Sequence, residues 1–268
     1  MAARRAKSVV SVVSARPDGA TTVAAALAAH WSAAERALLI DLNLERPEIA
    51  PLLDVGATKT IYHLAFNAQL APVAADDLEE DLAWHEGLAV LSGVSRPNQG
   101  SAVSDHFVGA LVEQAAQRFD RIVIDLGRLR PQMLPALESD ELLLLVVPGP
   151  LGLAAVEAAS LDHKDAGVTW PNSLKVVLNR CGPRDFIGVD RFLSVEYGLE
   201  VIGQVPDVPA YAKSVELSHS LRALSVPAGD DRTFIRRYGP EALALRQGIE
   251  SLSAALERAE PLRVAGGS

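Results

Sequence analysis

Short apolar runs separated by stretches of helical pattern are the feature that most limits how this 268-residue chain can fold. Most of the runs are continuously apolar rather than alternating, which is typical of strands covered on both faces. Their alternation with helices predicts a doubly wound, mostly parallel sheet in a three-layer α/β/α fold, with helices on both faces. The predicted strands lie at residues 8–13, 37–41, 88–93, 121–127, 141–148, 174–179 and 200–206.

Helical periodicity fills the intervals between these runs. Right-handed crossovers should place the loops that follow the strands along one edge of the sheet, where α/β folds usually bind ligands. We expect residues 69–87 to be an irregular acidic excursion and residues 260–268 to be a disordered tail, which predicts a single domain over residues 1–259. The helices are predicted at 21–34, 105–119, 152–167, 190–198 and 240–259.

The charge balance limits the classes of partner. A formal net charge of −9 disfavours non-specific binding to nucleic acid or anionic lipid, and only residues 2–7 form a basic cluster. A single cysteine, Cys181, excludes an internal disulfide and a self-contained cysteine-ligated metal site, and it favours a reducing cytoplasm. We expect residues 249–264 to pack on the domain rather than to anchor it in a membrane.

Residues 8–30 have the frame of a phosphate-binding loop. A buried strand leads into a turn containing Gly19, and a helix begins near Thr21 and Thr22. In such loops, backbone N–H groups surround the phosphates, a lysine neutralises them, and a hydroxyl joins the Mg²⁺ shell. Ala20 stands at the lysine position. Taken alone, the segment fits equally a structural turn with a threonine near the helix N-cap.

The wider chain resembles the ParA/MinD family of P-loop ATPases. Further blocks follow in the family's order at 37–55, 119–127, 139–159, 174–185 and 200–224. Within the family, the strand VVLNR resembles the CpaE/TadZ group, which positions Tad-type pilus machinery at the cell pole. The family's deviant Walker A motif, K-G-G-x-G-K-T-T, aligns with Ala15, Arg16, Pro17, Asp18, Gly19, Ala20, Thr21 and Thr22.

The resemblance implies a role for acidic residues at two strand ends. It places Asp41 and Asp125 on the Mg²⁺ side of the nucleotide, and it puts Asn43 where relatives have a second Asp that orients or activates water. Asparagine accepts hydrogen bonds but is not a general base. Asp125 also has a structural alternative, as a strand-end residue that caps the next turn. No permanent metal site is predicted.

The resemblance also implies an adenine side, formed by Asn179, Arg180, Pro206 and Asp207, which otherwise are ordinary turn residues. Both family lysine positions hold alanine, Ala15 and Ala20. Arg16 either substitutes for one lysine or is simply a solvated arginine, and arginine and lysine differ in reach and geometry.

These substitutions predict a chain that is not an enzyme. Single charge-stabilising groups contribute roughly 10²–10³ in rate, and phosphoryl transfer depends on such groups. Two cations and one carboxylate are missing, and Asp18 should repel phosphate. We therefore predict a pseudo-ATPase scaffold that binds ATP or ADP with Mg²⁺ only weakly.

The predicted partners are proteins, either pilus or secretion machinery such as an assembly ATPase, and a second copy in a nucleotide-independent homodimer. The predicted location is the cytoplasm, with at most peripheral contact with the inner face of the membrane or the cell pole. The alternative function is a slow ATP-hydrolysing switch that dimerises with nucleotide. A DNA-partitioning protein is disfavoured by the acidic charge.

Overall fold

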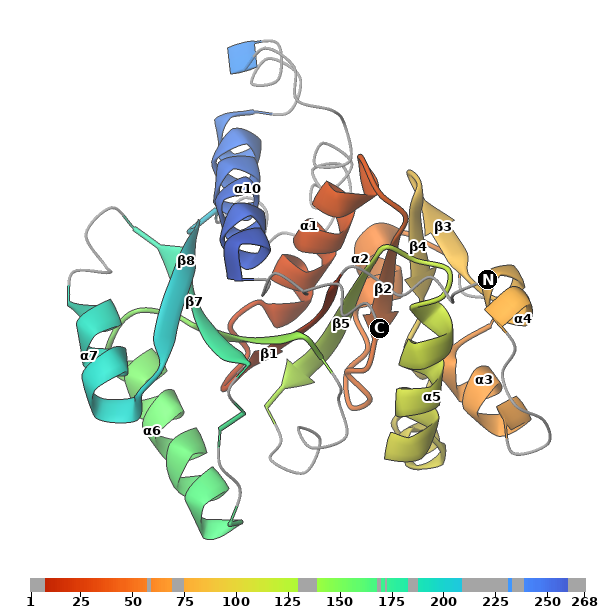
Figure 1. The fold of residues 1–268 in the computed structure, drawn as a ribbon, viewed down its shortest axis with the longest axis horizontal. Coiled ribbons are helices and arrows are strands. Elements are labelled where there is room, and N and C mark those ends of the chain that lie inside the picture. Colours follow the sequence, from red (N-terminus) through yellow and green to blue (C-terminus); the bar gives the residue numbers. More distant parts are fainter. Residues whose placement is uncertain are drawn as a thin grey trace, which may run out of the picture.

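The computed structural model describes residues 8–56, 59–68, 75–129, 139–167, 170–171, 173–182, 188–208, 231–232 and 239–259, without the side chains of 75–77. Within these residues, eight strands form one sheet in the order β3-β4-β2-β5-β1-β6-β7-β8 (Figure 1). The strands are β1 (Ser8–Ser14), β2 (Ala37–Asp41), β3 (Ala83–His85), β4 (Leu88–Leu91), β5 (Arg121–Arg128), β6 (Glu141–Val146), β7 (Leu174–Cys181) and β8 (Glu200–Pro206).

All neighbouring strands pair in parallel except β3 and β4, which are antiparallel. The central strand β1 lies between β5 and β6, and its seven residues are all buried. Parallel strands need helical crossovers, and these crossovers cover the sheet on both faces. The predicted fold class, a doubly wound and mostly parallel sheet, is therefore confirmed.

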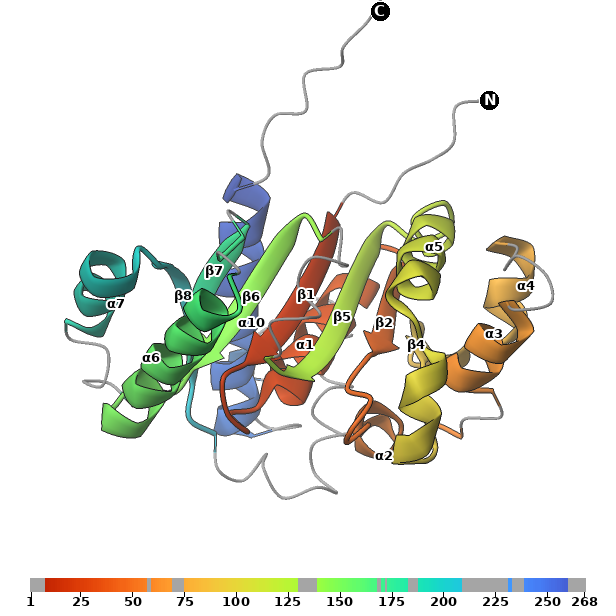
Figure 2. The ribbon, with the colours of Figure 1, turned by 90° about the horizontal axis from the view of Figure 1, so that it is seen from below.

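Two apolar cores lie on opposite faces of the sheet (Figure 2). One contains residues of α1 (Ala20–Ser32), α2 (Ile49–Leu53) and α10 (Pro240–Ala259). The other contains residues of α3 (Ile61–Ala68), α5 (Asp105–Ala115), α6 (Pro150–Asp165) and α7 (Val189–Tyr197). Alanine-rich α1 buries seven consecutive residues, Val23 to Ala29, because small side chains let it lie close to the sheet.

Part of the predicted acidic excursion is regular structure, so that prediction is wrong for its described residues. Within 75–87 the chain forms α4 (Ala75–Glu80) and then strand β3, whose main chain pairs with β4 at the edge of the sheet. The acidic composition of this stretch gave no sign that Leu78 is buried or that β3 forms a short hairpin with β4. Helices α2 and α3 and the 3₁₀ turn η1 (Pro97–Ala102) were not predicted either.

The last helix packs on the domain, as expected. Ile249, Leu252 and Leu256 of α10 are buried in the core that contains α1. None of the described helices combines the length and the apolar character that a membrane-spanning segment requires. The basic cluster at 2–7, residues 209–224 of the last family block and the tail at 260–268 lie outside the described residues.

Candidate functional site

The loop between β1 and α1 lies at the carboxyl edge of the sheet. Gly19 is the N-cap of α1 and has a φ of 92°, a left-handed conformation that glycine adopts without strain. No side chain caps this end of the helix, and Thr21 lies near the N-cap as its second helical residue. The first N–H groups of α1 are therefore available to an anion, as at other phosphate-binding helix ends.

Asn179 at the end of β7 supports this loop from below. Its side-chain amide Nδ2 donates a hydrogen bond to the carbonyl oxygen of Asp18 over 2.5 Å. A Cβ on Gly19 would lie 2.9 Å from the same Nδ2, so the amide and the glycine fit closely together. The resemblance predicted that Asn179 lies on the adenine side, and in the structure its amide holds the loop main chain.

Asp41, the last residue of β2, lies beside Asp125 of β5 in the register of the two strands. Both oxygens of Asp41 accept main-chain hydrogen bonds, Oδ1 from Asn43 N and Oδ2 from Ile49 N, each 3.1 Å long. Burial and then the neighbouring Asp125 raise the pKa of Asp41 to about 8. Asp41 thus caps the turn after β2, and its charged form is disfavoured by burial and by Asp125 beside it.

Asp125 is fully buried, and one of its oxygens is unsatisfied. Oδ1 accepts a hydrogen bond from Gly127 N over 2.9 Å, whereas Oδ2 has no hydrogen-bond partner among the described residues. Burial raises the pKa of Asp125 to about 6, although the Thr21 hydroxyl and the Gly127 N–H lower it. A buried acceptor without a partner is rare in proteins, and a water molecule or a cation would satisfy it.

The residues around Asp125 fit a Mg²⁺ ion. The Thr21 hydroxyl at the start of α1 and the unsatisfied Asp125 oxygen are hard oxygen ligands, which Mg²⁺ prefers. A cation here would relieve the buried negative charge of the Asp41–Asp125 pair. Within the described residues no three His, Cys, Asp or Glu side chains could hold a metal by themselves, so water or phosphate would complete the shell.

Asn43 lies over the end of β5. Gly127 has a φ of 64°, and a Cβ on it would come within 2.3 Å of Asn43 Cγ. The Asn43 side-chain oxygen accepts a hydrogen bond from Arg46 N over 3.3 Å. Asn43 therefore lies next to the acidic pair, where it can orient water but cannot take a proton.

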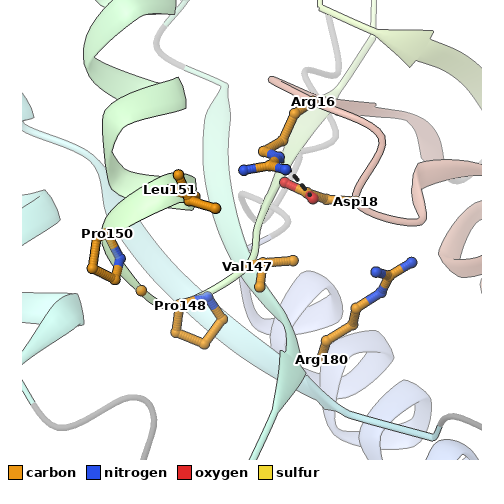
Figure 3. A pocket seen from close by; sticks show the side chains of 9 residues that line it. Arg16, Asp18, Val147, Pro148, Pro150, Leu151 and Arg180 are labelled. Carbon is orange, nitrogen blue, oxygen red and sulfur yellow. Dashed lines mark ion pairs between the residues drawn. The ribbon is translucent and has the colours of Figure 1, made fainter.

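Arg16, Asp18 and Arg180 line a pocket beside the loop (Figure 3). Arg16 Nε lies 3.5 Å from Asp18 Oδ1, so Arg16 forms an ion pair and is not simply solvated. The Asp18 side chain is only 7 % exposed. It lies between the two arginines rather than projecting freely toward an incoming phosphate.

The other predicted residues occupy the surroundings of the loop. Ala15 is half-buried against the core, Pro17 is exposed, Ala20 is buried and Thr22 is half-buried. Pro206 ends β8, and Asp207 N donates to the Cys181 carbonyl oxygen over 3.2 Å. Pro206 and Asp207 thus lie at the strand end next to Arg180, on the side of the loop away from Asp125.

No protein-family model matches the sequence, and no curated protein is significantly similar to it. Solved structures do match the fold. A ParA family ATPase from Chlorobium tepidum TLS aligns with a TM-score of 0.68 and 19% identity over 94% of this chain and 99% of its own.

The septum site-determining protein MinD from Pyrococcus horikoshii OT3, complexed with Mg-ADP, aligns with a TM-score of 0.63 and 20% identity over 94% of this chain and 96% of its own. A variant of McdA from Cyanothece, in complex with ATP, aligns with a TM-score of 0.65 and 15% identity over 94% and 97% of the two chains.

This chain has the ParA/MinD fold. That finding overturns the prediction that it is not an enzyme, because the solved proteins that share the fold include ATPases and proteins with Mg-ADP or ATP bound. The prediction rested on the groups that are absent from the motif and did not include the polar and charged residues that are still present. Thr21, Asp41 and Asp125 converge at the end of the loop, and two arginines lie beside it.

Sequence reasoning missed one wall of the pocket beside the β1–α1 loop. Residues 147–152, between β6 and α6, line the pocket opposite Arg16 and Arg180. Their sequence, VPGPLG, carries a signal that was not used, because glycine and proline at the carboxyl end of a parallel strand mark a loop at the ligand-binding edge.

Proposed function

We propose that this chain is a slow ATP-hydrolysing switch of the ParA/MinD type, which binds a nucleoside triphosphate with Mg²⁺ at the β1–α1 loop and dimerises with it. One observation carries the proposal. The buried Asp125 has an oxygen without a hydrogen-bond partner among the described residues, and the Thr21 hydroxyl is close enough to the same carboxyl to lower its pKa. This arrangement favours a cation bound by the Asp125 carboxyl and the Thr21 hydroxyl over a purely structural turn.

The loop would bind the phosphates mainly through its main chain. The N-terminus of α1 offers N–H groups and a positive partial charge. Mg²⁺ held by Thr21 and Asp125 would neutralise charge on the terminal phosphates. Arg16 and Arg180 add positive charge beside the loop, where the family has lysine within it. Arginine binds phosphate oxygens in a bidentate fashion, so its contacts with phosphate differ in geometry from those of lysine.

The turnover should be slow. Asn43, beside the acidic pair, can hold a water molecule by a hydrogen bond but offers no carboxylate to polarise it. Both lysine positions of the motif carry alanine, which removes cationic contacts to the phosphates. Slow hydrolysis suits a switch, because the lifetime of the triphosphate state then sets how long a dimer persists.

The output of the switch is proposed from the resemblance to CpaE/TadZ proteins. A nucleotide-bound dimer would recruit a protein of the pilus or secretion machinery at the cytoplasmic face of the membrane or at the cell pole. The acidic net charge of −9 favours a protein partner over DNA. A fluorescent fusion in the native cell tests this output. Polar foci that vanish with Asp125→Asn would support it, and a uniform signal in both would contradict it.

The activity itself is tested by phosphate release from ATP with and without Mg²⁺. We expect slow release that needs Mg²⁺ and falls by roughly 10²-fold or more in Asp125→Asn. Asp190→Asn, on the exposed surface of α7, is the matched control and should leave the rate unchanged. Wild-type release no faster than that of Asp125→Asn would rule out the proposed activity.

A further inference from the structure

A pocket of about 290 Å³ opens beside the β1–α1 loop, at the carboxyl ends of β1, β6 and β7 (Figure 3). One wall is the β6–α6 loop, residues 147–152, whose side chains carry no charge. The charged lining residues are Arg16, Asp18 and Arg180. The pocket therefore combines an uncharged wall with two cations and one anion.

The two arginines come from segments far apart in the sequence. Arg16 follows β1 and is 40 % exposed, and its Nε lies 3.5 Å from Asp18 Oδ1. Arg180 is exposed on β7 and has a φ of 56°, a left-handed conformation that is uncommon for residues other than glycine. Both guanidinium groups lower the pKa of Asp18, so both act on the same carboxyl group.

Asp18 fills the position of an anion in this arrangement. Its carboxylate forms an ion pair with Arg16 and lies in the same pocket as Arg180, and the Val147 main chain also lowers its pKa. Two guanidinium groups and a main-chain N–H form a donor set that also suits a phosphate group. Burial is nevertheless the largest influence on Asp18 and raises its pKa, so its charged form is not fully compensated there.

We propose that Arg16, Arg180 and the Val147 N–H form an anion site that the Asp18 carboxylate occupies in the nucleotide-free chain, and that a phosphate group displaces Asp18 from it. The inference rests on the proposed function, since the phosphate group is that of the nucleotide at the adjoining loop. Asp18 thus weakens anion binding by competing for the two arginines. These arginines supply the positive charge that the alanines at positions 15 and 20 do not.

The test measures binding of inorganic pyrophosphate, and separately of ATP with Mg²⁺, by titration calorimetry. Asp18→Asn keeps the shape of the side chain and removes its charge, so pyrophosphate affinity should rise about tenfold or more. Adding Arg180→Ala to that variant should abolish the gain, and Arg180→Lys should keep part of it. Asp190→Asn and Arg191→Ala, exposed on α7, are the matched controls and should change nothing.

The proposal is wrong if Asp18→Asn binds pyrophosphate no more tightly than wild type, or if the gain survives Arg180→Ala. Should Asp18→Asn fail to fold, Arg180→Ala alone decides, since it must still weaken pyrophosphate binding. Failure of the proposed function looks different, because it removes ATP hydrolysis while leaving the pyrophosphate results intact. Light scattering during the ATP titration shows which copy supplies the phosphate. If Asp18→Asn binds ATP more tightly as a monomer, the phosphate is that of the chain's own nucleotide. If the affinity rises only in a dimer, the phosphate is that of a second copy's nucleotide.

Discussion

The side-chain amide of Asn179, at the end of β7, donates a hydrogen bond to the carbonyl oxygen of Asp18, 161 residues earlier in the chain. The bond is buried and joins the two sides of the carboxyl edge, where β1 and β7 are separated by β6. It fixes the main chain of the β1–α1 loop immediately before the N-cap of α1. The position of this loop is therefore set by a strand outside the β1–α1 unit.

Replacing Asn179 by alanine should loosen the loop. The Asp18 carbonyl oxygen would lose a buried partner, so the free energy of unfolding should fall by about 1–3 kcal/mol. Affinity for ATP with Mg²⁺ should fall as well, because the main-chain donors are no longer held in place. Denaturant unfolding and calorimetry measure the two effects. Asn67→Ala, on the exposed side of α3, is the control, and an equal loss there would remove the special role of Asn179.

Gly19 cannot carry a side chain without strain. At a φ of 92°, a Cβ would be in a disfavoured conformation and 2.9 Å from Asn179 Nδ2. We expect Gly19→Ala to lower the free energy of unfolding by about 1–3 kcal/mol. Gly109→Ala in α5 is the opposite case, since nothing lies within 4 Å of its Cβ position and its φ is not positive. There, stability should rise by about 0.5–1 kcal/mol, and thermal unfolding of both variants checks the difference in sign.

The acidic pair predicts how the stability of the metal-free protein depends on pH. Asp41 and Asp125 have pKa values raised from 3.8 to about 8 and about 6. Between the unfolded and native values, the native state holds protons that the unfolded chain has released, so stability falls as pH rises. Each such group contributes about 1.4 kcal/mol per pH unit. The fall should be steeper up to about pH 6, weaker up to about pH 8, and then end.

Urea titrations across this range measure the profile. Asp125→Asn should remove the part of the fall that ends near pH 6, and Mg²⁺ should raise stability most at the alkaline end, where both carboxylates are charged. A profile that is flat from pH 4 to pH 8 without Mg²⁺ would contradict the burial of this pair.

Arg121 joins three elements at the opposite edge of the sheet. Its Nε lies 2.6 Å from Glu35 Oε2, its Nη2 lies 3.5 Å from Glu257 of α10, and its guanidinium carbon lies 5.0 Å from the centre of the Trp31 ring. The Arg121 side chain is only 6 % exposed, so its removal breaks a largely buried ion pair with Glu35. Arg121→Ala should lower the free energy of unfolding by about 3 kcal/mol.

Arg191, exposed on α7, is a matched arginine whose removal should change stability little. Thermal unfolding of Arg191→Ala and Arg121→Ala gives the comparison. A Glu257→Gln variant should lose much less than Arg121→Ala, because Glu257 is half exposed and solvent screens its charge. Equal losses in the three variants would show that Arg121 is not a specific link between β5, α1 and α10.

Local patterning in the sequence was sufficient for the fold class. Continuously apolar runs such as 8–13 and 141–148 are typical of strands covered on both faces. Each is a buried parallel strand in the structure, with its end moved by one or two residues. The hairpin of β3 and β4 was missed, because the three residues of β3, Ala83 to His85, have no long apolar pattern and gain their pairing only from β4.

For the candidate site, the sequence by itself placed the polar residues Asp41, Asp125 and Asn179 in the carboxyl-terminal halves of apolar strands. Only the tertiary structure decided what those residues contact. Asp41 is bound by its own turn, Asp125 keeps an oxygen with no partner among the described residues, and Asn179 holds a loop 161 residues away. Spacing along the chain carries no information on such contacts, since the order of the strands in the sheet differs from their order in the sequence.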